Sequence, residues 1–123
     1  MKKLVLIFLL ILIPYSVQAY QFCKNWTKYD TAFEVTYVGL TVIDWGQTRN
    51  MVKEGGYHEI NPLLGRHPSL DTVDTLIPLS IVAHGLVSMA LPPKYRRYWQ
   101  VLFIGGEIAA VWNNYNVGLR IDF

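Results

Sequence analysis

Residues 31–49 read TAFEVTYVGLTVIDWGQTR, and this stretch decides the fold class because polar residues recur along it with a helical period. The recurring polar residues are spaced three or four apart, so an α-helix places them all on one face. They are Glu34, Tyr37, Thr41, Asp44 and Thr48. Valine, leucine and isoleucine cover most of the remaining helix surface. The pattern predicts an apolar helix whose single polar stripe faces protein.

Two further segments, at about residues 72–91 and 98–119, show the same arrangement. Each carries its own polar stripe at helical spacing. The stripes are Ser80, His84 and Ser88 in the first segment and Gln100, Glu107 and Asn114 in the second. No stretch alternates with the two-residue period of a β-strand. We therefore predict an all-α fold, a small helical bundle that is polar inside and apolar outside.

The composition indicates that this bundle lies in a membrane. Hydrophobic residues make up 52% of the 123 residues and charged residues 16%, against about 25% charged residues in a soluble domain. A net charge of +2 with no clustered basic face argues against a nucleic-acid partner. Cys23 is the single cysteine, which excludes an intramolecular disulfide and a cysteine metal cluster. The expected partner is the lipid bilayer.

The N-terminus has the features of a secretory signal. Lys2 and Lys3 precede an apolar run over residues 4–13, which is shorter than the roughly 20 residues that span a bilayer. Val17-Gln18-Ala19 then supplies small residues where a signal peptidase cleaves. We predict a signal peptide over residues 1–19, with a retained signal anchor as the alternative. Residues 20–123 would form one domain in a membrane, with the bacterial inner membrane as the expected location.

The breaks between the helices are defined by glycine and proline. Gly55-Gly56 and Asn61-Pro62 lie in a predicted loop over residues 50–71, which we expect to fold back onto the helix ends. Pro92-Pro93 ends the second helix and makes the second and third helices antiparallel neighbours. Three helices, one long loop and a signal segment complete the predicted transmembrane bundle.

Helix depth predicts a polar site in two tiers. With a rise of about 1.5 Å per residue, Glu107 and His84 lie near the middle of their helices, so we predict that they pair. An outer tier would form around Asp44, beneath the loop. The full candidate cluster comprises Asp44, Thr48, Glu59, Asn61, His84, Glu107 and Asn114.

Each of these residues also has a purely structural explanation. Amides such as Asn114 connect membrane helices through hydrogen bonds, whereas a carboxyl in mid-membrane, such as Glu107, is costlier than packing requires. His58-Glu59 begins like a zinc-protease motif, but Pro62 stands where the second histidine should be. The spacing requires no metal, and we expect no cofactor.

Two motifs carry a resemblance to a protein family. They are Asp44-Trp45-Gly46-Gln47-Thr48 and Glu59-Ile60-Asn61-Pro62-Leu63-Leu64-Gly65. Together they resemble an Asp-x-x-x-Thr … Glu-x-Asn-Pro pattern of small uncharacterised bacterial and phage integral membrane proteins. The resemblance implies an integral membrane bundle and brings no catalytic role.

Three functions remain open from the sequence. The first is an accessory or interaction protein that acts by contact in the membrane, on a membrane protein partner or as a homo-oligomer. The second is an intramembrane ligand, ion or proton site lined by Asp44, His84 and Glu107. The third is a membrane-embedded hydrolase that uses the carboxylates and His84 as acid and base. The first leads, so a non-enzymatic role is favoured.

Overall fold

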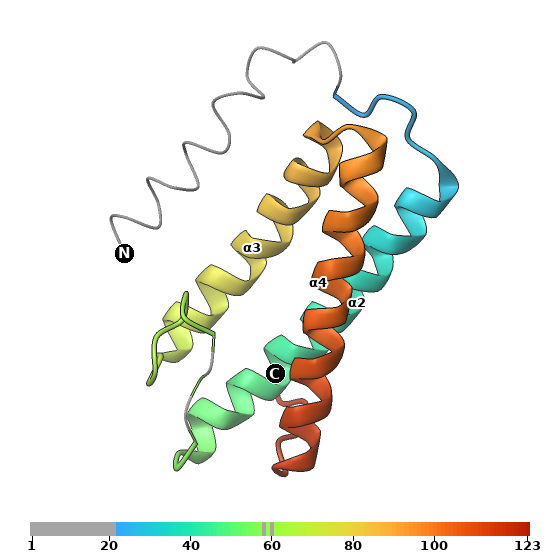
Figure 1. Cartoon of the computed structure of the whole chain (residues 1–123). Helices are drawn as coiled ribbons and strands as arrows, with labels where there is room; N and C mark the ends of the chain where they lie inside the picture. The colour runs from blue at the N-terminus through green and yellow to red at the C-terminus, as the bar shows by residue number, and fades with distance from the viewer. Residues whose placement is uncertain (1–21, 58, 60) are drawn as a thin grey trace.

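The computed structural model of the chain describes residues 22–57, 59 and 61–123. The predicted signal segment and its cleavage site therefore lie outside the described residues. The described residues form three helices and no strand: α2 (Lys28–Glu54), α3 (Leu70–Ala90) and α4 (Pro93–Asn116) (Figure 1). The all-α prediction is confirmed.

Caps explain why α2 is longer than the predicted helix. Thr27 and Asp30 form a capping box, in which the Thr27 amide donates to Asp30 Oδ2 at 2.8 Å and the Asp30 amide donates to Thr27 Oγ1 at 3.3 Å. At the other end the helix continues to Glu54 and stops at Gly55, whose φ of 70° suits glycine.

Capping and proline also set the ends of α3 and α4. The Ser69 hydroxyl accepts a hydrogen bond from the Thr72 amide, which starts α3. The helix ends before Pro92-Pro93, as predicted, but α4 begins at Pro93 itself, five residues before the expected start. Proline suits the first helical position because its fixed φ is already helical and its missing N–H would have no helical partner there.

The helix α2 holds the bundle together, because it packs against α3 and α4 more extensively than they pack against each other. The antiparallel helices α3 and α4 meet at the Pro92-Pro93 end and separate towards the other end, called here the loop end (Figure 1). An apolar cluster of Leu64, Val73 and Ile77 fills the loop end with Trp45 and Val52 of α2. The loop thus folds back onto the helices, as predicted.

The residues after α4 return across α2 as a C-terminal strap (residues 117–123), which the sequence analysis did not predict. The Asp122 amide donates to the Gly46 carbonyl oxygen at 3.1 Å, and the Phe123 ring meets the Trp45 ring edge to face at 5.3 Å. A Cβ atom at Gly46 would lie 2.7 Å from Ile121 Cγ2. Glycine is therefore required at position 46 for the strap to approach this closely.

The interior is mostly polar and the surface is rich in apolar side chains. Among the described residues, eight buried side chains are polar or charged and six are hydrophobic. The buried polar residues are Asp30, Thr41, Gln47, Thr48, His84, Ser88, Arg96 and Gln100. Large apolar side chains such as Leu79, Leu102 and Trp112 are more than half exposed. This distribution is the reverse of that in a soluble protein.

One described helix, α3, is long and apolar enough by itself to cross a membrane. The predicted transmembrane bundle thus has one helix that meets this criterion, and α4 is not among the described helices that do. At 24 residues α4 is long enough, but its first turns carry Lys94, Arg96 and Arg97 and its later turns carry Glu107 and Asn114. Only α3 therefore supports a membrane location on its own composition.

Candidate functional site

The imidazole of His84 pairs with Glu34, not with Glu107. His84 Nδ1 lies 3.1 Å from Glu34 Oε2, and Gln100 Nε2 donates to Glu34 Oε1 at 3.0 Å. The predicted His84–Glu107 pair is wrong because α2 packs against both α3 and α4, so its own polar stripe supplies the partner for His84. Glu34 was placed on that stripe, but it was not chosen as a site residue.

Aromatic rings hold the His84 imidazole in place. The Tyr37 ring stacks on it at a centroid distance of 3.8 Å, and the Trp99 ring stacks at 5.3 Å. The Phe103 ring meets it at 5.0 Å with an interplanar angle of 63°. His84 is 2% exposed, and its Nε2 atom has no hydrogen-bond partner among the described residues. The ring is therefore fixed by packing and by a single hydrogen bond to Glu34.

Glu107 belongs to the tier around Asp44. Asp44 Oδ1 accepts a hydrogen bond of 2.7 Å from Asn114 Nδ2. The Glu107 carboxyl interacts with the Asp44 carboxyl and with the Thr41 hydroxyl, and its Oε2 atom is buried without a hydrogen-bond partner. The loop carboxyl of Glu59 also acts on Asp44. The structure thus brings together four of the predicted site residues, and three of the four are acidic.

A cavity of about 300 Å³ opens beside this tier at the loop end. Glu59 and Asn114 belong both to the polar tier and to the cavity wall. The lining residues are Met51, Gly56, Tyr57, Glu59, Asn113, Asn114, Val117 and Leu119. Within the described part of the chain, no group of three or more histidine, cysteine, aspartate or glutamate residues is arranged to hold a metal ion.

Two of the predicted site residues, Thr48 and Asn61, serve the fold. Thr48 is buried, at 2% exposure, on the interior face of α2. Asn61 is exposed and shapes the loop. Its backbone amide donates to Glu59 Oε1 at 2.8 Å, and its side-chain Oδ1 accepts from the Leu63 backbone amide at 3.0 Å. Asn61 therefore links Glu59 to the turn at residues 62–64, and it lies outside the buried cluster.

A buried arginine, which sequence reasoning missed, organises the Pro92-Pro93 end. Arg96 is fully buried, and its guanidinium donates to the carbonyl oxygens of Ser88, Leu91 and Lys24 at 2.8–3.0 Å. It also forms an ion pair with Asp30 at 3.4 Å. Because α4 starts at Pro93, Arg96 lies one turn before Gln100 on the same face, and this spacing could have revealed it.

Asp30 is held in its charged form by these neighbours. The Thr27 amide and hydroxyl donate to Asp30 Oδ2 at 2.8 and 2.9 Å, and Arg97 Nη2 donates to Asp30 Oδ1 at 3.4 Å. The positive charge of Arg96 adds to these hydrogen bonds. The buried charges of Asp30 and Arg96 at this end of the bundle are therefore paired.

No family model, curated protein or solved structure matches this chain. The resemblance to small bacterial and phage membrane proteins thus stays a prediction.

Proposed function

We propose that this chain is a small integral membrane protein that acts by contact with a helix of another membrane protein. The observation that carries the proposal is the reversed distribution of polarity, with polar side chains inside the bundle and apolar side chains outside. Lipid favours such a surface, whereas water disfavours it. The apolar helix α3 would cross the bilayer, and α2 and α4 would cross with their polar stripes turned inwards.

An exposed face of α4 supports contact as the mode of action. Gly105, Gly106 and Ala109 lie on this face and are exposed, with Leu102 and Trp112 on either side. A Cβ atom added at either glycine would meet no neighbouring atom within 4 Å. Small residues let membrane helices approach closely, so this face suits a partner helix.

Membrane washing and co-purification test the two parts of the proposal. Carbonate and high-salt washes should leave the chain in the membrane fraction, and release into the soluble fraction would contradict the proposal. Gly106→Leu should reduce co-purification of a crosslinked membrane partner. Gly39→Leu is the matched control, because Gly39 is an exposed glycine of α2 with open space around it. Equal loss in both variants would exclude the α4 face.

The tier around Asp44 favours a second candidate function, a proton or cation site inside the bundle. Asp44 and Glu107 interact, and no lysine or arginine of the described residues forms an ion pair with either. Two carboxylates in a water-poor interior repel each other, and a proton or a bound cation would relieve the repulsion.

Neutral variants and chemical labelling separate the two candidates. A protein that acts by contact should keep its activity in Asp44→Asn and Glu107→Gln, whereas an ion or proton site should lose it. Dicyclohexylcarbodiimide, which modifies protonated carboxyls in apolar surroundings, should label the wild-type chain. Mass spectrometry should show that Glu107→Gln abolishes the label. Unchanged labelling would exclude Glu107 as the protonated group.

A further inference from the structure

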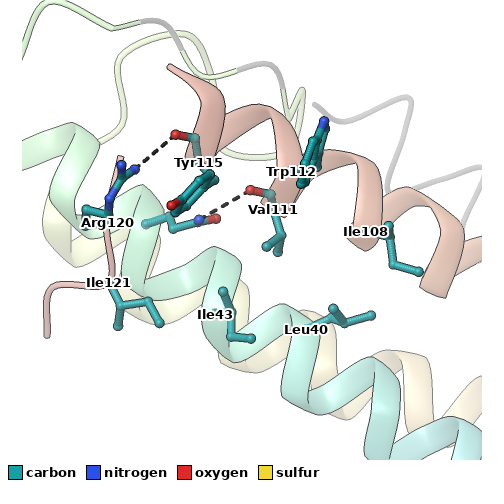
Figure 2. A pocket seen from close by; sticks show the side chains of 9 residues that line it. Leu40, Ile43, Ile108, Val111, Trp112, Tyr115, Arg120 and Ile121 are labelled. Carbon is teal, nitrogen blue, oxygen red and sulfur yellow. Dashed lines mark hydrogen bonds between the residues drawn. The ribbon is translucent and has the colours of Figure 1, made fainter. Parts of the chain in front are cut away.

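An apolar groove of about 500 Å³ lies on the outside of the bundle, between α2 and α4 (Figure 2). Leu40 and Ile43 of α2 form one wall, and Ile108 and Val111 of α4 face them. The remaining lining residues are Gln47, Trp112, Tyr115, Arg120 and Ile121. The groove is large enough for a small molecule, since such sites usually measure roughly 300–1,000 Å³.

The strap brings a positive charge to one end of this groove. The Arg120 guanidinium lies 4.1 Å from the centre of the Tyr115 ring, and its Nη1 atom donates to the carbonyl oxygens of Tyr115 and Leu119 at 3.0 and 2.8 Å. These two bonds orient the Arg120 side chain, but they use only one of its three guanidinium nitrogens. No carboxylate of the described residues forms an ion pair with it.

A buried amide adds an acceptor to the same groove. Gln47 is 3% exposed, and its Nε2 atom donates to the Val111 carbonyl oxygen at 3.3 Å (Figure 2). Its Oε1 atom is buried and has no hydrogen-bond partner among the described residues. Such an atom costs free energy unless a ligand or water donates to it. The groove therefore combines an apolar wall, a cation at one end and a buried amide among its lining residues.

The depth of the groove in the membrane indicates what kind of ligand would occupy it. Arg120 lies beyond the C-terminal end of α4, and the groove runs back along the helix to Ile108, about 10 Å from Tyr115. If α4 crosses the bilayer as proposed above, Arg120 lies at headgroup level and the apolar wall faces the hydrocarbon. We propose that the groove binds an anionic phospholipid. Its phosphate contacts Arg120, and one acyl chain lies along the groove.

Lipid selectivity of the full chain tests the proposal. The purified protein in detergent is titrated with phosphatidylglycerol or with phosphatidylcholine of the same acyl chains, and bound lipid is counted by native mass spectrometry. Wild type should bind phosphatidylglycerol more tightly. Arg120→Gln should lose about tenfold in affinity for it, because a charge-assisted contact is lost. The matched control Arg66→Gln removes an exposed arginine of the loop and should retain the preference.

A second pair of variants tests the acyl-chain position. Ile108→Trp narrows the groove and should weaken binding of both lipids, whereas Leu79→Trp changes an exposed position of α3 outside the groove and should not. Equal binding of both lipids to wild type, equal loss in Arg120→Gln and Arg66→Gln, or a protein dimer in place of bound lipid would overturn the lipid site. The proposal rests on the membrane location. If the chain resists the carbonate wash but binds no lipid, only the lipid site is disproved. If carbonate releases the chain, both the lipid site and the membrane location are disproved.

Discussion

The two ends of this bundle bury polar groups in opposite ways. At the Pro92-Pro93 end, Arg96 is fully buried but donates to three carbonyl oxygens and to Asp30. Towards the loop end, Asp44 and Glu107 interact with each other and have an asparagine and a threonine as neighbours. A paired buried charge serves the fold, whereas buried carboxyls without a cationic partner are candidates for a functional site. The comparison therefore separates structural polarity from candidate chemistry.

The largest effect should follow the loss of Arg96. Arg96→Met leaves three buried carbonyl groups without their donor and removes the buried positive partner of Asp30, which should lower the free energy of unfolding by about 3–5 kcal/mol. Denaturant unfolding in detergent measures this. Arg97→Met is the control, because Arg97 is 43% exposed and should cost less than about 1 kcal/mol. If Arg96→Met fails to fold, Arg96→Lys should fold with a smaller loss. Equal losses at positions 96 and 97 would contradict the comparison.

A smaller, pH-dependent effect is expected at Asp30. The charged Asp30 carboxylate accepts from Thr27 and Arg97 and pairs with Arg96, so it stabilises the fold while it is ionised. Protonation at acid pH removes this stabilisation. Asp30→Asn should therefore be less stable than wild type by about 2 kcal/mol at pH 7, and the difference should shrink at acid pH. Thermal unfolding across pH measures it, with the exposed Asp71→Asn as control. A constant difference would show that charge is not the cause.

The C-terminal strap stabilises the loop end, as Arg96 and Asp30 stabilise the Pro92-Pro93 end. Gly46→Ala places a Cβ atom 2.7 Å from Ile121 Cγ2, so the strap must move, at a cost of about 1.5 kcal/mol. Carboxypeptidase should then remove the C-terminal residues faster. Gly39→Ala on the same helix meets no atom within 4 Å and should be neutral or slightly stabilising. Unchanged digestion of Gly46→Ala would mean that the strap does not depend on this contact.

The smallest stability effect is expected at Glu107. Glu107→Gln removes one of two interacting carboxyls, so unfolding stability should stay within about 0.5 kcal/mol of wild type or rise slightly. Glu34→Gln makes the matching change in the paired tier and should destabilise, because Glu34 accepts from both His84 and Gln100. Unfolding midpoints of the two variants measure the contrast. A loss at Glu107 as large as that at Glu34 would mean that both carboxyls are structural.

Much of the fold could be predicted because helical periodicity is a local property. The polar stripes of all three helices follow from spacing alone, and Pro92-Pro93 separates α3 from α4 as expected. The helix ends were less certain, since they depend on caps: the Thr27–Asp30 capping box and the start at Pro93 extend α2 and α4 beyond the periodic segments. The outer tier around Asp44 was also predicted, because Asp44 and Asn114 share one depth and Glu59 lies in the loop that closes over them.

The sequence by itself determined that each helix has one polar face, because polar residues recur along it at helical spacing. If lipid surrounds the bundle, these faces are expected to turn inwards. Only the tertiary structure decided which polar groups meet. Spacing fixes the face of a residue but not how the helices cross, so Glu34, 50 positions away along the chain, reaches His84 in place of Glu107. The strap has no periodicity, and its place against Gly46 depends on side-chain contact alone.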